Sequence, residues 1–198
     1  MNEASSLTKA QLRLERLALR DALSVEDRQA KSLAMAQSGA QALCFSPGTI
    51  VSGFMPIRSE ADTRPLMEAL RDKGATLCLP VMLDRETIVF RAFARNAELV
   101  KTGFGTSGPD ESAAVLDPHI LLVPLSAFDG HGQRIGYGAG HYDRAIARLH
   151  AKGLEPLLIG IAFDCQEVPS VPAEAHDVAL DAILTESGLR HFSGRAGA

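Results

Sequence analysis

The sequence predicts a three-layer α/β/α sandwich, in which helices cover both faces of a mostly parallel β-sheet. Short apolar segments alternate with helix-like ones along the chain, as expected when crossover helices connect parallel strands. The 198 residues are enough for one sizeable core and too few for two large domains. Hydrophobic residues (46%) and charged residues (22%) occur in the proportions of an ordinary globular protein. We therefore expect residues 1–198 to form a single domain.

Two helices are expected near the N-terminus. Thr8 and Gln11 have the spacing of a capping box, which predicts a first helix from there to about Leu23. Ser24 is a favoured N-cap residue, so a second helix should follow it and run towards Cys44.

The middle of the chain predicts strands around a third helix. Residues 47–48 (Pro-Gly) indicate a turn, and the apolar segment 49–54 indicates a strand. Thr63 should open a helix to about Lys73, with Gly74 as its left-handed C-terminal cap. Further strands are expected at residues 76–80, 87–93 and 119–124. The segment 87–93 follows its predecessor at hairpin distance, which would make the sheet mixed.

A glycine-rich segment separates the last of these strands from a fourth helix. It is residues 132–144 (GQRIGYGAGHYDR), and it leads into a helical pattern over 142–152 that ends at Gly153. Residues 157–163 (LLIGIAF) predict another buried strand. Ligands of open parallel sheets bind beyond the carboxyl ends of the strands, so a site is expected at the glycine-rich segment.

Charge and cysteine content exclude several classes of protein. The net charge of −4 gives no electrostatic basis for nucleic-acid binding, which normally requires a basic domain. The three cysteines include no C-x-x-C pair, which argues against a disulfide framework or a zinc site and fits a reducing cytoplasm. No apolar run has the length of a membrane span, and no targeting signal is apparent. We expect a cytoplasmic protein without nucleic-acid or membrane partners.

The glycine-rich segment has the chemistry of a phosphate site. Gly136, Gly138 and Gly140 leave backbone N–H groups unshielded at the start of a helix, and Arg134 and Arg144 can add positive charge. The spacing fits neither the dinucleotide nor the P-loop fingerprint. Asp143 could bind a magnesium ion carried by the phosphate. The alternative is a glycine-rich turn in which Asp143 only caps the helix.

Residues 123–144 (VPLSAFDGHGQRIGYGAGHYDR) resemble the signature of the 5-formyltetrahydrofolate cyclo-ligases, also called 5,10-methenyltetrahydrofolate synthetases. The residues that match in register are Pro124, Ala127, Phe128, Asp129, Gly132, Arg134, Gly136, Gly138, Gly140, Tyr142 and Asp143. Matches elsewhere include Lys9 with Arg13, Glu60 within FMPIRSEADT, and Asp177 in the closing segment. The resemblance thus extends over nearly the whole chain. It fails in the loop 103–111, where Gly108-Pro109 replaces a Glu-Pro of the family.

The resemblance implies an ATP-dependent cyclisation of 5-formyltetrahydrofolate to 5,10-methenyltetrahydrofolate, with release of ADP and phosphate. The γ-phosphoryl group would be transferred to the formyl oxygen, and nitrogen 10 of the folate would then displace phosphate. Such a reaction needs cations, magnesium and backbone amides that neutralise charge during the transfer. The implied partners are ATP, Mg²⁺ and the folate, and we expect a monomer.

The resemblance also implies residue roles. ATP contacts are expected at Lys9, Arg13, Arg134, Ile135, Gly136, Tyr137, Gly138, Ala139, Gly140, His141 and Tyr142. Substrate contacts are expected at Met55, Glu60, Tyr137, Gly138, Ala139, Gly140 and His141. The catalytic roles fall to Arg134 and Tyr142, and the metal ligands are Asp143 and Asp177.

Without the resemblance, purely structural interpretations of these residues remain open. Lys9 and Arg13 could belong to a solvated basic face shared with Arg16 and Arg20, and Asp177 could be a loop cap. Met55 could be an ordinary core residue. Two rival functions also remain: another enzyme on a similar α/β fold, such as a sugar-phosphate isomerase or acyl-transfer protein, and a non-catalytic relative that binds nucleotide or RNA. The joint presence of the implied polar residues favours the cyclo-ligase.

Overall fold

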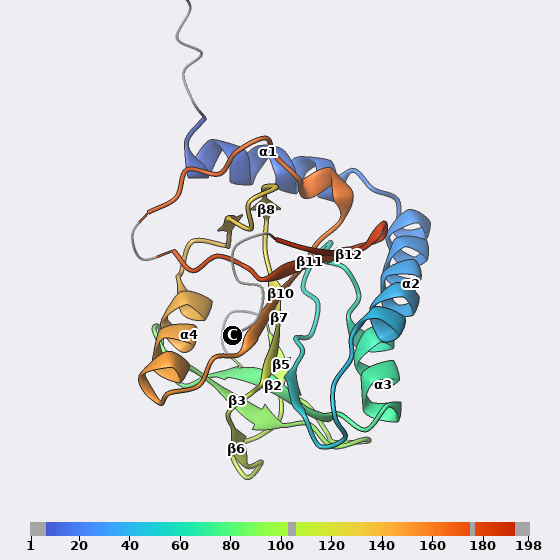
Figure 1. Cartoon of the computed structure of the whole chain (residues 1–198), viewed down its shortest axis with the longest axis vertical. Coiled ribbons are helices and arrows are strands. Elements are labelled where there is room, and N and C mark those ends of the chain that lie inside the picture. Colours follow the sequence, from blue (N-terminus) through green and yellow to red (C-terminus); the bar gives the residue numbers. More distant parts are fainter. Residues whose placement is uncertain (1–6, 103–105, 175–176, 193–198) are drawn as a thin grey trace, which may run out of the picture.

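One mixed sheet runs through the molecule, with strand order β12–β11–β10–β7–β1–β2–β3–β6 (Figure 1). The computed structural model describes residues 7–102, 106–174 and 177–192. The strands from β11 to β2 in this order are parallel, and antiparallel pairs lie at both edges. The strands of this sheet are β1 (Ile50–Ser52), β2 (Thr76–Met82), β3 (Ile88–Ala92), β6 (Val115–Leu116), β7 (Ile120–Pro124), β10 (Leu157–Ile161), β11 (Ala182–Thr185) and β12 (Gly188–His191).

Helices lie on both faces of the sheet, which confirms the three-layer arrangement. They are α1 (Lys9–Asp21), α2 (Val25–Ala42), α3 (Arg64–Asp72) and α4 (His141–Ala151). Helices α2 and α3 pack together on one face and α4 covers the other, while α1 runs across the top of the molecule (Figure 1). Two small strand pairs complete the fold: β4 (Val100–Lys101) with β5 (Ser107–Gly108), and β8 (Ala127–Phe128) with β9 (Arg134–Ile135).

The local signals at the helix ends are confirmed. The backbone N–H of Thr8 donates to Gln11 Oε1 at 2.8 Å and the Thr8 side chain accepts from the Gln11 N–H, which completes the capping box of α1. Ser24 Oγ accepts from the Asp27 N–H at 2.9 Å at the start of α2. Gly74 follows α3 with φ of 97°, the left-handed conformation that glycine adopts without strain.

Two hydrophobic clusters fill the spaces on either side of the sheet. Strand β7 shows how its residues are divided between them: Leu122 packs towards α2 and α3, whereas Leu121 and Val123 pack towards α4. Alternate residues of a strand point to opposite faces, so a central strand with both faces covered is apolar throughout. This is why residues 120–124 form an unbroken apolar run.

A third, smaller cluster attaches α1 to the end of the sheet. Leu12 of α1 packs against Ala127, Ile135, Val168 and Val171, which lie beyond the carboxyl ends of β7 and β10. Helix α1 also contacts the short 3-10 helix Asp164–Gln166 that follows β10. The N-terminal helix is therefore placed over the edge at which ligands of parallel sheets bind.

Several expectations about element bounds are corrected. Strand β2 continues through Pro80 to Met82. Proline has no backbone N–H, but β1 ends at Ser52, opposite Cys78, so Pro80 lies beyond the part of β2 that pairs with β1. The strand expected over 49–54 is shorter, and α2 ends at Ala42 rather than at Cys44. The hairpin β11–β12, which turns at Gly188 with φ of 115°, was not expected. Part of the loop 103–111, residues 103–105, lies outside the described residues.

No helix in the described part of the chain combines the length and the apolar character needed to cross a membrane.

Gly160 in β10 offers a test of how tightly the core is packed. A Cβ at this position would approach Leu180 Cδ1 at 2.6 Å, Ile183 Cδ1 at 2.7 Å and Leu125 Cδ2 at 2.8 Å. Gly160→Ala should lower the free energy of unfolding by about 1–3 kcal/mol, because overpacking forces neighbouring side chains to move. Urea denaturation measures the change. Gly130→Ala is the matched control, since its Cβ would meet nothing within 4 Å and should leave stability nearly unchanged.

Candidate active site

The glycine-rich loop forms a thin wall between two pockets. It connects β9 to α4, with Gly138 at φ of 100° and Gly140, the N-cap of α4, at 65°. The pocket on one side has a volume of about 460 Å³ and the pocket on the other side about 570 Å³. Residues that line both pockets are Arg13, Arg134, Gly136, Ala139, Gly140 and Asp143. Two ligands bound in these pockets would thus meet at the loop.

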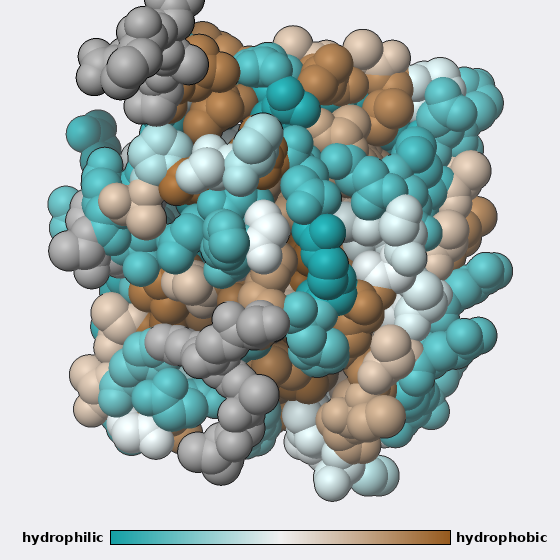
Figure 2. Space-filling model, turned by 45° about the horizontal axis from the view of Figure 1, so that its top comes forward, coloured by the Kyte–Doolittle hydropathy of each residue, from teal (hydrophilic) through white to brown (hydrophobic). Residues whose placement is uncertain are grey.

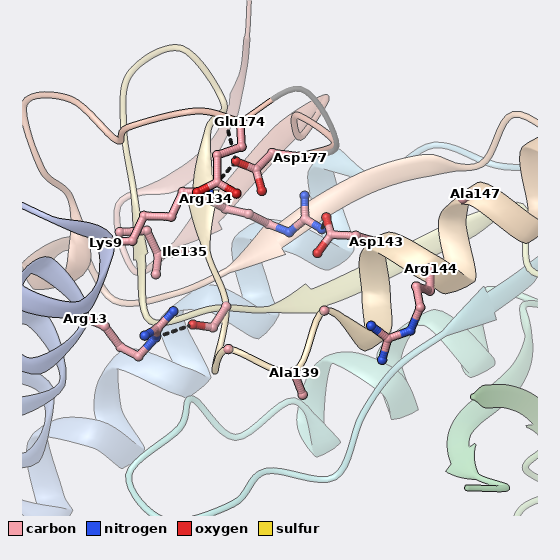
Figure 3. Close-up of a pocket in the computed structure, with 13 residues that line it drawn as sticks. Lys9, Arg13, Arg134, Ile135, Ala139, Asp143, Arg144, Ala147, Glu174 and Asp177 are labelled. Carbon is pink, nitrogen blue, oxygen red and sulfur yellow. Dashed lines mark hydrogen bonds and ion pairs between the residues drawn. The ribbon is translucent and has the colours of Figure 1, made fainter. Parts of the chain in front are cut away.

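The smaller pocket is lined by charged side chains from four parts of the chain (Figure 3). Its cationic residues are Lys9 and Arg13 of α1, Arg134 of β9 and Arg144 of α4; its carboxylates are Asp143, Glu174 and Asp177. Backbone of the glycine-rich loop supplies the rest of its floor. A pocket of this composition suits a ligand that carries both phosphates and a metal cation.

The charges of this pocket are paired with one another. Lys9 Nζ lies 2.5 Å from Asp177 Oδ2 and 3.4 Å from Glu174 Oε1. Burial alone would lower the pKa of Lys9, but its hydrogen bonds and ion pairs with Asp177 and Glu174 outweigh burial and raise the pKa. Lys9 is therefore a cation at neutral pH. The Arg13 Nε–H donates to the carbonyl oxygen of Gly136 at 2.8 Å, which ties α1 to the glycine-rich loop.

Arg134 brings the closing segment of the chain back to the glycine-rich loop. Its side chain is buried; one guanidinium nitrogen donates to the Val178 carbonyl and another to Asp143 Oδ1 at 2.6 Å. The Val178 N–H in turn lies 3.5 Å from Asp143 Oδ1. These bonds place Asp177 and Asp143 in the same pocket, as expected of a shared site (Figure 3).

The larger pocket has mostly apolar walls with a few polar groups. Its apolar lining includes Phe54, Met55, Ile57, Met82 and Ile88. When the molecule is tilted so that its top comes forward, brown hydrophobic surface is interspersed with hydrophilic residues on the face in view (Figure 2). An apolar cavity with few polar groups is typical of a site for a small organic ligand.

Glu60 is the carboxylate of the larger pocket. Its Oε1 accepts the hydroxyl hydrogen of Tyr137 at 2.5 Å and its Oε2 accepts the Ile57 N–H at 2.9 Å. Burial raises the pKa of Glu60, although both hydrogen bonds act to lower it. Tyr142 also lines this pocket, and its Oη is buried without a hydrogen-bond partner among the described residues. An unpaired buried hydroxyl is a group that a polar ligand atom can satisfy.

Helix α4 fastens the β2–β3 hairpin beside the pockets. His141 Nε2 lies 2.8 Å from the Arg85 carbonyl oxygen, and the Arg144 Nε–H donates to that of Glu86 at 2.8 Å. One turn further on, Arg148 donates to the carbonyl of Ile88 at 2.8 Å. Ile88 lines the larger pocket, so these bonds couple the position of its wall to α4.

The structure divides the predicted site residues between the pockets in a way that the sequence does not predict. Those that line only the smaller pocket are Lys9, Ile135, Gly138 and Asp177; those that line only the larger one are Met55, Glu60, Tyr137, His141 and Tyr142. Arg144, which the sequence predicts as a source of positive charge, lines the smaller pocket. Sequence reasoning missed Glu174, which lies on the same pocket, and mentioned Arg20 only in the alternative of a solvated basic face. Arg20 is 1% exposed and contacts Tyr137.

Comparisons with known proteins agree with this geometry. Residues 5–186 match the model of the 5-formyltetrahydrofolate cyclo-ligase family. A protein of Escherichia coli (strain K12) named 5-formyltetrahydrofolate cyclo-ligase is 32% identical over 85% of this chain and 94% of its own. The mouse protein of the same name is 26% identical over 83% of this chain and 87% of its own.

A solved structure shares the whole architecture. The 5,10-methenyltetrahydrofolate synthetase of Aquifex aeolicus superimposes with a TM-score of 0.79 at 28% identity, covering 97% of this chain and 96% of that one. The match of the family model over nearly the whole chain and the similarity of its relatives lead to one conclusion. The chain belongs to the 5-formyltetrahydrofolate cyclo-ligase family.

Proposed function

We propose that this protein catalyses the ATP-dependent cyclisation of 5-formyltetrahydrofolate to 5,10-methenyltetrahydrofolate, with release of ADP and phosphate. The observation that carries the proposal is the pair of pockets on either side of the glycine-rich loop, one lined by charges and one mostly apolar. A reaction between a nucleotide and a folate requires two such sites that meet. Family membership supports the same reaction, because the relatives are named for it.

The smaller pocket holds the triphosphate of ATP in this proposal. Lys9, Arg13, Arg134 and Arg144 supply positive charge, and the glycine-rich loop supplies backbone N–H groups at the start of α4. In the structure, Lys9 is paired with Asp177 and Arg134 is paired with Asp143. Phosphate oxygens would take over as partners of these cations, and the two carboxylates would become available to a cation bound with the nucleotide.

That cation is Mg²⁺ in our proposal. Among residues 7–102, 106–174 and 177–192, no group of three or more histidine, cysteine, aspartate or glutamate side chains is placed to hold a metal ion. Mg²⁺ fits nonetheless, because it keeps several waters and binds one or two carboxylates together with substrate phosphates. Asp143 and Asp177 would hold it, and when bound it neutralises phosphate charge during the transfer.

The larger pocket holds the folate. Its apolar walls suit the pterin ring, and Glu60 is a hydrogen-bond acceptor for the amino and ring N–H groups of the pterin. Met55 forms part of the apolar wall. The glycine-rich loop borders both ligands, so the formyl oxygen of the folate would face the γ-phosphate of ATP across it.

The chain's own residues orient and neutralise the reacting groups. The γ-phosphoryl group moves to the formyl oxygen and ADP leaves; nitrogen 10 then attacks the formyl carbon, the C–O bond breaks, and nitrogen 10 releases its proton as phosphate departs. Arg134 lines both pockets and is buried, so its charge acts with little screening where the phosphoryl group crosses. The Tyr142 hydroxyl, unpaired among the described residues, is the donor for the formyl oxygen.

In this proposal the protein acts as a cytoplasmic monomer without nucleic-acid or membrane partners. The net charge of −4 supports the first exclusion, since RNA binding depends on basic surfaces. A non-catalytic role on the same fold has no support from the relatives, which are named as ligases or synthetases.

The direct test is formation of methenyltetrahydrofolate, followed by its absorbance, from 5-formyltetrahydrofolate with and without ATP. We expect product only when ATP is present, with one ADP released for each folate closed. A protein that binds ATP and folate but forms no product under these conditions would contradict the proposal.

Gly138 tests the glycine-rich loop. Gly138→Val should reduce turnover at least tenfold, because valine resists the φ of 100° at a strain of about 1–3 kcal/mol and its side chain would press on the Arg13 guanidinium, 3.8 Å from the Cβ position. Steady-state kinetics on the folded variant measure the loss. Gly48→Val is the control: it imposes the same strain at φ of 85°, with nothing within 4 Å and outside both pockets, and should lower stability without lowering turnover.

Asp143 and Asp177 test the magnesium proposal. Asp143→Asn and Asp177→Asn each keep the side-chain shape but remove a negative charge, so turnover should fall and the magnesium concentration for half-maximal rate should rise. The double variant should lose less than the sum of the single losses, since the two groups would serve one ion. Magnesium titrations measure all three. Asp117→Asn, which breaks only an exposed ion pair with Lys152, should titrate like the parent; unchanged titrations of both single variants would refute the assignment.

A further inference from the structure

Arg20, near the end of α1, is buried to 1% exposure although it is a cation. Its guanidinium donates to two hydroxyls: Nε to Ser59 Oγ at 2.9 Å, and Nη1 to Tyr137 Oη at 2.6 Å. The guanidinium carbon also lies 5.8 Å from the centre of the Tyr137 ring. Removing a guanidinium from water costs free energy, so these contacts require an explanation beyond the packing of one helix.

The direction of each hydrogen bond follows from the chemistry of the donors. A guanidinium only donates, so the Tyr137 oxygen must accept from Arg20 and its single hydrogen is left for Glu60 Oε1. The same reasoning applies to Ser59, which accepts from Arg20 and donates to Asp21 Oδ1. One buried cation thereby orients two hydroxyls, and each of them donates to a carboxylate.

The two hydroxyls lie at the larger pocket: Tyr137 lines it, and Ser59 is next to Glu60, which also lines it. Tyr137 lies in the glycine-rich loop, and Ser59 precedes Glu60 in the segment that follows β1. Arg20 therefore fastens these two segments to α1 and to each other. Because Lys9 and Arg13 of the same helix line the smaller pocket, α1 carries groups that serve both pockets.

We propose that Arg20 is a positioning residue for folate binding, which fixes the Tyr137 hydroxyl and, through it, the Glu60 side chain that receives the pterin. The inference rests on the proposed function and deepens it. Arg20, at the C-terminal end of α1, would thus act in substrate binding without contacting the substrate, since it does not line either pocket.

Removing Arg20 should change the titration of Glu60. Burial raises the pKa of Glu60, and the positive charge of Arg20 is one of the influences that lower it. Without that charge the pKa of Glu60 should rise further. The carboxylate would then become protonated at a higher pH than in the parent when the pH is lowered. The other charged or titratable groups around Glu60 or on the same pocket come from three elements: Arg58 on its own segment; Arg134 and Tyr137 from the glycine-rich segment, with His141, Tyr142 and Asp143 at the start of α4; and Arg13 and Asp21 of α1. All of them remain in an Arg20 variant.

The experiment compares Arg20→Met, Arg20→Lys and Arg16→Met with the parent. Arg20→Met should raise the KM for 5-formyltetrahydrofolate about tenfold and leave the KM for ATP unchanged, because the charge-assisted bond that is lost orients Tyr137, which lines only the larger pocket. The acid limb of kcat/KM for the folate should move to higher pH by about one unit. Arg20→Lys should restore the acid limb but only part of the KM, since lysine keeps the charge without the two-pronged geometry.

Arg16→Met is the matched control. It removes an arginine from the same helix, but one whose Nη1 donates to the backbone carbonyls of Cys165 and Glu167 rather than to groups of the larger pocket. It should leave the folate KM and the acid limb as in the parent. Equal effects of Arg16→Met and Arg20→Met on both readouts would show that either arginine only supports the fold, and would overturn the inference.

A second measurement separates this inference from the proposed function. The ¹³C carboxyl signal of Glu60, identified by its absence in Glu60→Gln, can be titrated in the ligand-free protein. Arg20→Met should raise its midpoint and Arg16→Met should not. If only Arg20→Met raises the midpoint of Glu60 and the parent protein forms no methenyltetrahydrofolate, the proposed reaction is refuted and the Arg20–Tyr137–Glu60 coupling is retained. An active parent in which Arg20→Met leaves the midpoint and the folate KM unchanged would refute the coupling alone.

Discussion

The inward-facing basic side of α1 is the feature on which the two pockets depend. Lys9 binds Asp177, Arg13 binds the Gly136 carbonyl, and Arg20 binds both Tyr137 and Ser59. One helix thus holds three segments that are distant in the sequence: the closing segment, the glycine-rich segment and the segment that follows β1. Arg16 adds bonds to backbone carbonyls beyond β10. The sheet places these segments at one edge, but the cations of α1 fix how they lie relative to one another. Without α1, the bonds of Arg134 would still join the closing segment to the glycine-rich segment, but the segment that follows β1 would lose its link to Tyr137 through Arg20.

This arrangement reverses the usual division of an amphipathic helix. Leu14 is 71% exposed and Leu19 44%, whereas Arg20 is buried. A helix normally buries its apolar stripe and leaves charges in water. Here the guanidiniums of α1 donate to carbonyl and hydroxyl oxygens and the Lys9 ammonium donates to a carboxylate, which offsets the cost of removing these cations from water. Leu12 still provides an apolar contact beneath the helix, so α1 is held by packing and by polar bonds together.

The features that the sequence predicts depend on local signals, and those that it does not predict depend on contacts between distant segments. Capping residues such as Thr8 and Ser24 act locally, so the helix starts were predictable from short patterns. The glycine-rich segment was found because its composition is unusual at any position in a fold. Arg20 was missed because its spacing from Arg13 shows a shared helix face but not whether that face points inward. That depends on oxygens from segments that only the tertiary structure brings near, as does the edge hairpin β11–β12.

The glycine-rich loop shows where sequence constraint comes from the ligands rather than from the protein. Gly136 has no positive φ, and a Cβ there would meet nothing within 4 Å. Neither backbone conformation nor packing in the ligand-free chain requires glycine at this position. Yet Gly136 lines both pockets, so any side chain would project into space that a ligand occupies. Gly138 and Gly140 are different, because their left-handed backbone favours glycine even without a ligand. The loop thus combines two reasons for glycine, and together they keep the wall between the two pockets free of side chains at these three positions.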